Sequence, residues 1–444
     1  MKPSFILLGL TLSLATTAPA AAPKEQQPKW VGAWAYVTTP LAPGVPPTSP
    51  SWPFVRVVPL APLSASVAAV PIAPVENPGG LPVDGSFEDL TNVTIRQIVR
   101  VSAAGSAVRL RLSNESGGES LAVGAVHVGL AGPDGAVLPG TDRVVAFAGN
   151  GSVVIPAGAP LLSDSVPLPV KALDRLAISL HVPGRVALRN ARSLPAYIAG
   201  PNGDSTAAAR LPQPRIARAP ALVTEVEVAA AQPTNVIVAL GDSITEGVGS
   251  TALAFHGWPD RLADRLVALP GRVRWAVVGA GISGNRLLRY GAGPNALARF
   301  DRDVLSVPGL TTIILLEGIN DIGNGFNPAG SAEPVTADAL KSAYRQIIER
   351  AHEHGVRVIG GTLTPYKGAG YASDAGEAVR QEINAWIRAS GAFDGVVDFD
   401  AAIADKTDPH IIDKSFNDGD RLHPNDAGYK AMADAIDLKL LTGK

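Results

Sequence analysis

The chain has 444 residues, of which 46% are hydrophobic and 18% are charged, and its formal net charge is -2. This length exceeds what one hydrophobic core usually serves, so we expect two domains, and the charge lacks the basic excess of nucleic-acid-binding proteins. Cysteine is absent, which excludes disulfides, thiolate nucleophiles, zinc-cysteine sites and iron-sulfur clusters.

Residues 1–20 have the pattern of a cleavable export signal. Lys2 supplies a positive start, residues 5–14 form an apolar core, and Ala18-Pro19-Ala20 is a small-residue cleavage pattern. The alternative is a disordered or membrane-retained N-terminus, but the apolar run is too short to span a bilayer comfortably. We expect an exported protein, periplasmic or extracellular, with no transmembrane segment in the mature chain.

A β-rich N-terminal domain is predicted over residues 21–230. Residues 30–36 alternate aromatic and small side chains and suit a strand, whereas prolines recur through 40–82 and predict an irregular excursion. That excursion is either a plain surface loop or a cover over part of a binding cleft. Short alternating runs separated by turn residues then predict an antiparallel β-sandwich, with strands at 93–101, 107–112, 125–130, 143–148, 152–155 and 176–182.

Residues 231–444 show a different pattern, in which apolar strand-like runs alternate with helical segments. This pattern predicts a parallel sheet with helices on both faces. An Ala/Pro-rich segment, 217–234, is the expected junction between the domains. Helices are expected at 337–354, where apolar residues recur every three or four positions, and at 424–440. The expected strands are 235–240, 273–278, 311–316, 356–361 and 396–399.

Ser243 follows the first of these strands, in Gly241-Asp242-Ser243-Ile244-Thr245-Glu246-Gly247. The glycines permit a tight turn at the carboxyl end of the strand, where open α/β sheets bind their ligands. We therefore propose Ser243 as a nucleophile. The alternative for this string alone is a serine N-cap, which is common at strand-to-helix turns.

A serine hydroxyl needs a base within hydrogen-bond reach and a third group that orients the base. Asp420 precedes His423 by three residues, so that both can face one side of a turn. Asp420 can then hold one tautomer of His423 and stabilise the imidazolium. A lone Asp/His pair in a loop is more often a surface hydrogen bond, and only the strand-terminal serine makes this one a candidate.

Acyl transfer also needs hydrogen-bond donors for the oxyanion. Gly284 lies in the glycine-rich loop after the second strand, and Asn320 follows the third strand. The Ser243 N–H, the Gly284 N–H and the Asn320 side-chain amide can converge on one oxygen. Either loop alone also fits plain turn chemistry, because Gly and Asn are standard turn residues.

These blocks, in this order, resemble the SGNH hydrolase family of GDSL-like esterases and lipases. The matching segments are Gly241-Asp242-Ser243, Ile282-Ser283-Gly284-Asn285, Gly318-Ile319-Asn320-Asp321 and Asp420 to His423. The resemblance implies a flavodoxin-like three-layer α/β/α fold, a metal-independent hydrolase without a cofactor, and an acyl-enzyme on Ser243. Residues 30–34 and 90–114 are similar to bimodular bacterial members, in which a β-sandwich precedes the hydrolase domain; that sandwich either binds carbohydrate or supports the active site.

The sequence thus predicts a serine esterase for short acyl groups, with acetyl favoured by family analogy and carbohydrate esters as one substrate class. A lipase or arylesterase of the same mechanism remains an alternative, as does a glycan-binding protein with an inactive hydrolase domain. No metal site is expected, since the histidines lack zinc-motif spacing. Trp52, Tyr197, Trp258, Tyr366 and Tyr371 suit either substrate stacking or ordinary packing.

Overall fold

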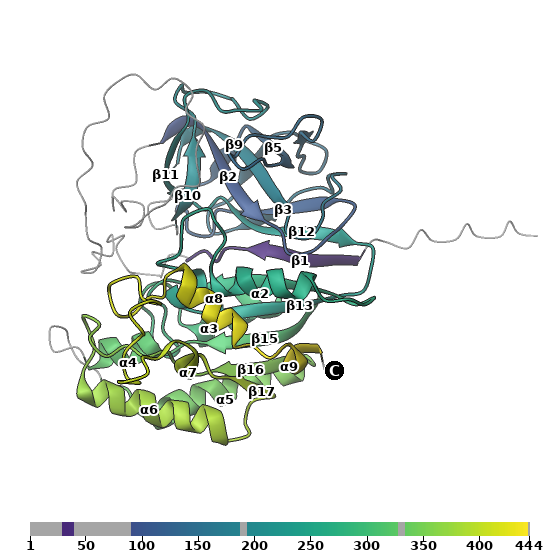
Figure 1. Cartoon of the computed structure of the whole chain (residues 1–444). Coiled ribbons are helices and arrows are strands. Elements are labelled where there is room, and N and C mark those ends of the chain that lie inside the picture. The colour runs from purple at the N-terminus through teal and green to yellow at the C-terminus, as the bar shows by residue number, and fades with distance from the viewer. Residues whose placement is uncertain (1–28, 40–89, 187–192, 327–333, 443–444) are drawn as a thin grey trace, which may run out of the picture.

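The structure is a computed structural model that describes residues 29–39, 90–186, 193–326 and 334–442. A β-rich part lies above an α/β part in Figure 1, and the chain passes from one to the other after residue 230. The predicted export signal, 1–20, and the proline-rich excursion, 40–82, lie outside the described residues. Among the helices of the described ranges, none is long and apolar enough to cross a membrane.

The β-rich part contains two antiparallel sheets, as predicted, and also a short two-stranded pair. Their orders are β1-β12-β3-β8, β11-β10-β2-β9-β5-β6 and β4-β7. The strands are β1 (Lys29–Ala35), β2 (Thr91–Arg100), β3 (Val108–Ser113), β4 (Leu121–Val123), β5 (Ala125–Leu130), β6 (Arg143–Val144), β7 (Val153–Ile155), β8 (Pro160–Leu162), β9 (Arg175–Arg185), β10 (Ser193–Ile198), β11 (Arg215–Pro220) and β12 (Val223–Ala230).

Alternation of side chains explains these strands. In β3, Val108, Leu110 and Leu112 are buried, while Arg109 and Arg111 point to the other face. The predicted strand over 143–148 is shorter in the structure, because pairing with β5 ends at β6 after two residues.

The junction predicted at 217–234 is wrong, because most of that segment is strand. β11 and β12 cover it, and only residues 231–233 connect β12 to the next strand. Within β12, Val226 and Val228 are buried next to Glu225 and Glu227, so a strand pattern underlies the Ala/Pro-rich composition. β12 pairs with both β1 and β3, which makes it an inner strand of its sheet.

The α/β part is built on a five-stranded parallel sheet of order β14-β13-β15-β16-β17, and this confirms the flavodoxin-like fold class. Residues 236–240 of β13 are fully buried, as expected of an inner parallel strand. The strand order reverses at β13, so the carboxyl end of β13 is the position where such sheets bind ligands. The strands are β13 (Thr234–Gly241), β14 (Arg274–Gly281), β15 (Leu310–Leu316), β16 (Arg357–Gly361) and β17 (Gly395–Val397).

Helices form two groups that cover the sheet. α2 packs with α8, and α8 packs with α7, while α3 packs with α5, and α6 with α4 and α5 (Figure 1). The helices are α1 (Ser243–Glu246), α2 (Trp258–Val267), α3 (Ala296–Phe300) with the following π-helical turn η1 (Asp301–Leu305), α4 (Ile319–Gly325), α5 (Ala337–Glu353), α6 (Asp374–Ala389), α7 (Phe399–Ile403), α8 (Asp426–Asp434) and α9 (Leu438–Thr442). α5 begins where predicted and buries the expected apolar face.

Two predicted boundaries are corrected by side-chain caps. The strand expected over 396–399 ends at Val397, because Asp398 accepts a hydrogen bond from the Ala401 N–H and starts α7. The helix expected over 424–440 is two helices. Asn425 caps α8, and Asp437 accepts a hydrogen bond from the Lys439 N–H ahead of α9.

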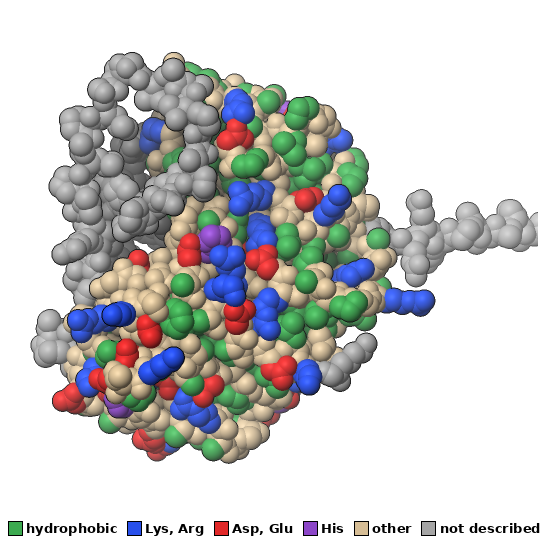
Figure 2. Space-filling model, viewed as in Figure 1, with side chains coloured by type: hydrophobic (Ala, Val, Ile, Leu, Met, Phe, Trp, Pro, Cys, Tyr) green, Lys and Arg blue, Asp and Glu red, His purple; other side chains and the backbone are tan. Residues whose placement is uncertain are grey.

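The two parts of the chain share one hydrophobic core, and β1 lies along their boundary (Figure 1). The Gly32 N–H donates to the Pro308 carbonyl at 2.9 Å. The Ser102 hydroxyl donates to the Val277 carbonyl at 2.8 Å and accepts from the Val277 N–H at 2.9 Å. On the face drawn in Figure 2, acidic and basic side chains are interspersed over both parts, as the small net charge suggests.

Candidate active site

Ser243 stands at the first position of α1, directly after the carboxyl end of β13. Gly241 is required there, because a Cβ would lie 2.3 Å from the Leu316 carbonyl oxygen and 2.2 Å from Thr245 Oγ1. Asp242 provides the N-cap, since its Oδ1 accepts a hydrogen bond from the Ile244 N–H at 2.9 Å. The serine N-cap considered from the sequence is therefore not the arrangement found, and the Ser243 hydroxyl has another partner.

That partner is His423, which lies in the loop before α8. His423 Nε2 lies 2.8 Å from Ser243 Oγ, and His423 Nδ1 lies 2.5 Å from Asp420 Oδ2. The exposed fraction rises along this series, from 6% for Ser243 to 15% for the His423 side chain and 43% for the Asp420 side chain. The three side chains that the sequence singled out thus form one hydrogen-bonded series that ends at the serine hydroxyl.

Asp420 is held as a carboxylate by its own loop. Its Oδ1 accepts the N–H groups of Leu422 and His423, each at 2.8 Å. Partial burial acts to raise the pKa of Asp420, but the hydrogen bonds from the His423 ring and from these two N–H groups outweigh it, and the pKa lies below its ordinary value. The Asp420 side chain therefore stays charged and can stabilise an imidazolium on His423.

Gly284 lies on the loop that continues β14, beside the nucleophile turn. The Ile282 N–H donates to the Gly241 carbonyl at 3.0 Å, which ties this loop to the end of β13. Gly284 is buried and has a φ of 72°, a conformation that favours glycine. Within the described ranges, no backbone carbonyl accepts the N–H of Ser243 or of Gly284. Both N–H groups are thus available to a ligand.

Asn320 is in the first turn of α4, at the carboxyl end of β15. Its Nδ2 lies 3.4 Å from Asp242 Oδ2, next to the nucleophile. The Tyr371 hydroxyl donates to Asn320 Oδ1 at 3.1 Å, which orients the amide with its NH2 group toward Asp242. The structure therefore gathers the three proposed oxyanion donors at the ends of three neighbouring parallel strands.

Buried charged side chains lie next to this site, in an arrangement that no sequence motif indicated. Arg299 is buried and donates to the carbonyls of Gly241 (2.9 Å) and Ala280 (2.8 Å), which ties β13 to β14 below the nucleophile. Arg299 also lies 3.7 Å from Glu317 Oε2. Burial raises the pKa of Glu317 well above its usual range and raises the pKa of Asp242 to about 7. Burial therefore disfavours the charged forms of both carboxyl groups next to Ser243.

Asp321 has a positioning role that its sequence neighbourhood did not reveal. Its carboxylate accepts the N–H groups of Leu287 at 2.6 Å and Leu288 at 3.0 Å. Burial nevertheless raises the pKa of Asp321 to about 6. Asp321 thus fastens the loop that follows Gly284 to the start of α4.

Four of the five aromatic residues considered for substrate stacking are buried, and the fifth lies outside the described ranges. Tyr197, Trp258, Tyr366 and Tyr371 are each at most 7% exposed, which favours the packing interpretation. Trp52 lies outside the described residues. Tyr371 nonetheless contributes to the site through Asn320, a role that sequence spacing could not have indicated.

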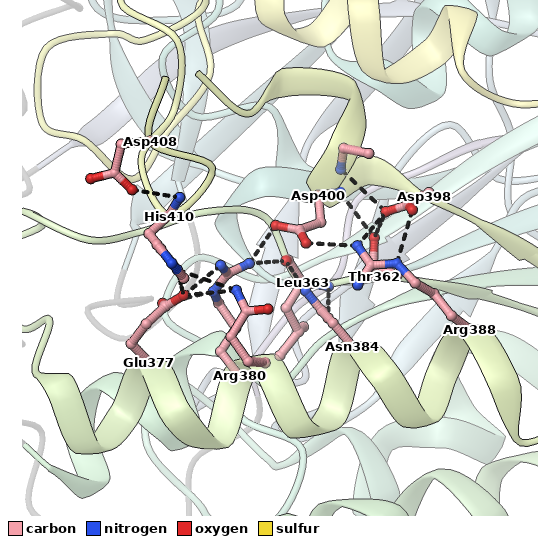
Figure 3. Close-up of polar contacts among 12 residues, drawn as sticks. Thr362, Leu363, Glu377, Arg380, Asn384, Arg388, Asp398, Asp400, Asp408 and His410 are labelled. Carbon is pink, nitrogen blue, oxygen red and sulfur yellow. Dashed lines mark hydrogen bonds and ion pairs between the residues drawn. The ribbon is translucent and has the colours of Figure 1, made fainter. Parts of the chain in front are cut away.

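Another histidine-carboxylate pair serves the fold. His410 Nδ1 lies 2.6 Å from Glu377 Oε1, and the same carboxylate pairs with the buried Arg380, which also reaches Asp400 (Figure 3). This network ties α6 to the loop that carries His410. His352 and His354 are exposed. Among the described residues, no three His, Asp or Glu side chains gather in a metal-binding arrangement.

Comparison with known proteins gives one family match. Residues 239–431 match the model of the GDSL-like Lipase/Acylhydrolase family. Similar solved structures include Axe2, an acetylxylan esterase from Geobacillus stearothermophilus (21% identity, 47% of this chain and 95% of that chain, TM-score 0.37). A putative lipolytic protein of the G-D-S-L family from Desulfitobacterium hafniense DCB-2 is 20% identical over 45% of this chain and 97% of that chain, with a TM-score of 0.35. No curated protein sequence matches significantly.

Proposed function

We propose that this carboxylic ester hydrolase, whose residues 239–431 match the model of the GDSL-like lipase/acylhydrolase family, cleaves short acyl esters through an acyl-serine intermediate on Ser243. The observation that carries this proposal is the 2.8 Å contact between Ser243 Oγ and His423 Nε2, with Asp420 on the other ring nitrogen. A nucleophile, a base and an orienting carboxylate are the groups that acyl transfer needs.

In the first half of the reaction, His423 takes the Ser243 proton while Ser243 Oγ attacks the ester carbonyl carbon. The carbonyl oxygen becomes an oxyanion, for which the N–H groups of Ser243 and Gly284 and the Asn320 amide are the donors. The tetrahedral intermediate then collapses, the ester C–O bond breaks, and His423 gives its proton to the departing alcohol. Asp420 stabilises the imidazolium that exists between these two proton transfers.

In the second half, water replaces the alcohol. His423 takes a proton from the water as its oxygen attacks the acyl carbon, and the same donors receive the second oxyanion. Collapse of this intermediate releases the carboxylic acid and returns the proton to Ser243 Oγ. One ester and one water thus give one acid and one alcohol, and the protein needs no further reactant.

We propose acetyl esters, carried on carbohydrate among other alcohols, as the substrate class. The family resemblance supports this choice, because exported two-domain members often deacetylate polysaccharides.

Export belongs to the same proposal. Lys2, the apolar residues 5–14 and Ala18-Pro19-Ala20 support cleavage near residue 20. The mature chain would then comprise a β-rich domain over 21–230 and the hydrolase domain over 231–444, in the periplasm or outside the cell. N-terminal sequencing of the protein recovered from outside the cytoplasm of a bacterial host tests this point, and an intact Met1 there would contradict it.

The catalytic proposal is tested with p-nitrophenyl esters of increasing chain length beside acetylated xylan, pectin and chitin fragments. Acetate is expected to be the best p-nitrophenyl ester, and the Ser243→Ala variant should lose about 10⁴-fold or more of kcat. Rates no higher than the uncatalysed background in both wild type and Ser243→Ala would favour the alternative, a non-catalytic glycan-binding protein. A preference for long chains would instead indicate a lipase.

A further inference from the structure

A hydrogen-bonded relay connects the β-rich part of the chain to the loop that carries Gly284. The Tyr36 hydroxyl donates to Glu246 Oε1 at 2.8 Å, across 210 positions of sequence. Glu246 Oε2 accepts two further hydrogen bonds from Ser283, one from its N–H at 2.7 Å and one from its hydroxyl at 2.5 Å. We infer that Tyr36 is a positioning residue for ester hydrolysis, because through Glu246 it fixes the Ser283–Gly284 peptide, whose N–H is a proposed oxyanion donor.

Glu246 is well placed to act in this way, because it belongs to the same short helix as the nucleophile. α1 begins at Ser243 and ends at Glu246, whose N–H donates to the Asp242 carbonyl at 2.9 Å. The helix also lies against the end of β14, where a Cβ on Gly281 would lie 2.3 Å from the Glu246 nitrogen. A displacement of the Glu246 carboxylate would therefore be transmitted through few contacts to both the nucleophile turn and the loop that carries Gly284.

Ser283 carries the effect to the candidate oxyanion donor. The peptide between Ser283 and Gly284 is planar, so the direction of the Gly284 N–H follows the orientation of Ser283. Two hydrogen bonds to one carboxylate oxygen fix Ser283 at its backbone and at its side chain. Gly284 itself, with a φ of 72°, has the conformational freedom that such anchoring restricts.

Tyr36 is anchored on the side of the β-rich part. It follows β1, and its N–H donates to the Thr224 carbonyl at 2.9 Å. Two residues later the Thr38 hydroxyl donates to Glu115 Oε2 at 3.1 Å, and the Thr38 carbonyl accepts from Arg302 at 3.0 Å. The phenol of Tyr36 therefore extends from a fixed backbone to Glu246. This arrangement makes the β-rich part a component of the active site through Tyr36.

The relay rests on the proposed function, and its first test is the Tyr36→Phe variant, which removes only the hydroxyl. Complete loss of an oxyanion donor costs about 10²- to 10³-fold in kcat, and a misaligned donor should cost less. We expect kcat for p-nitrophenyl acetate to fall about tenfold while KM stays nearly constant. The affinity for a boronic acid, which forms a tetrahedral adduct with a nucleophilic serine, should fall by the same factor as kcat/KM.

Ser102→Ala is the matched control. Ser102 also forms hydrogen bonds between the β-rich part and β14, through Val277, but it does not touch Glu246 or Ser283. This variant should lower the melting temperature without changing kcat or the boronic acid affinity. A fall in kcat in Ser102→Ala equal to that in Tyr36→Phe would mean that any weakened boundary slows the enzyme, and the relay would be overturned.

A double-mutant cycle with Glu246→Gln separates the relay from independent effects. If Tyr36 acts only through Glu246, then Tyr36→Phe should cause no additional loss of kcat in the Glu246→Gln background. The relay is overturned if the loss of kcat in the double variant equals the product of the losses in the two single variants. It is also overturned if Tyr36→Phe has the kcat of wild type. Ser243→Ala is measured in the same series: failure of the proposed function appears as wild-type turnover that does not depend on Ser243, whereas failure of the relay alone leaves that dependence intact.

Discussion

His423 Nε2 lies 2.8 Å from Ser243 Oγ, although 180 positions separate the two residues in the chain. Ser243 is fixed by the end of the central strand β13, and His423 by a loop that leads into α8. That loop holds Arg421 at a φ of 62°, and the Arg421 N–H donates to Asn417 Oδ1 at 3.2 Å. A strained backbone position beside His423 is typical of sites where the fold determines the geometry of a functional group.

The role of Asp420 is tested by the Asp420→Asn variant. The amide keeps the size of the side chain but removes the charge that faces the His423 ring, and it favours the wrong tautomer. We expect kcat for p-nitrophenyl acetate to fall about 10²- to 10⁴-fold, with the melting temperature little changed. Steady-state kinetics and thermal unfolding of the same preparation provide the check.

Asp418→Asn is the control for that variant, since Asp418 is in the same loop and its N–H donates to the His423 carbonyl, whereas the hydrogen bond to His423 Nδ1 comes from Asp420. Its loss should be far smaller than that of Asp420→Asn. Similar losses in the two variants would show that the charge of the loop, rather than the hydrogen bond to His423 Nδ1, matters for activity.

Asn320→Ala tests the oxyanion donors. Removal of the amide should lower kcat about 10²- to 10³-fold while KM changes little, because the donor acts on charge that develops only in the transition state. Asn324→Ala, one turn later on α4, removes a side chain that bonds the Asn320 carbonyl and should have a much smaller effect. An Asn320→Ala enzyme with raised KM and normal kcat would instead place Asn320 in ground-state binding.

Glu225 makes the stability of the fold depend on pH. Burial and the nearby charge of Glu227 raise its pKa from 4.5 to about 7, and its Oε1 is buried without a hydrogen-bond partner among the described residues. Between these two values the folded protein keeps a proton that the unfolded chain has lost, so stability falls as pH rises through this window. Above it, ionisation of this buried carboxyl group costs the folded state about 3 kcal/mol.

The Glu225→Gln variant cannot ionise at this position. It should therefore be more stable than wild type at about pH 8 and similar to wild type near the lower end of the window, as measured by urea unfolding. Glu227→Gln is the matched control on the same strand. Its carboxylate bonds Arg109 at 2.7 Å, so this variant should lose stability at the higher pH. A Glu225→Gln protein less stable than wild type at the higher pH would contradict the assignment.

The shared core predicts that the two parts of the chain unfold together. One cluster of buried apolar residues runs from Val31 on β1 through Val236 on β13 to Met432 on α8. Hydrogen bonds such as that from Gly32 to Pro308 cross the same boundary. Calorimetry of the full chain should therefore give one cooperative transition, and two well-separated transitions would show that the boundary contributes little to stability.

The fold class was predictable because its strands carry strong local patterns. Residues 236–240 form an unbroken apolar run that only an inner parallel strand buries on both faces, and β3 alternates Val and Leu with Arg. The linker predicted at 217–234 was wrong because it rested on the alanine and proline content of the segment. In that segment Val226 and Val228 alternate with glutamates, which is a strand pattern. The strand pattern was present there but weaker than the compositional signal.

The proposed catalytic residues were predictable because Ser243, Gly284, Asn320 and His423 each occupy a block of recognisable sequence. Their supporting residues were not. Arg299 bonds the ends of β13 and β14, and Tyr371 orients Asn320 from 51 positions away. Such contacts depend on how distant elements pack, and neither periodicity nor spacing along the chain records which side chains then meet.

The measurement that tests the central claim most directly is the identification of the acylated residue. Wild-type protein is mixed with p-nitrophenyl acetate, quenched in acid during turnover, digested and analysed by mass spectrometry. We predict one acetyl group on the peptide that contains Ser243, and neither acetyl group nor turnover in Ser243→Ala. An acetyl group found during turnover on another residue, or wild-type turnover by Ser243→Ala, would contradict the account.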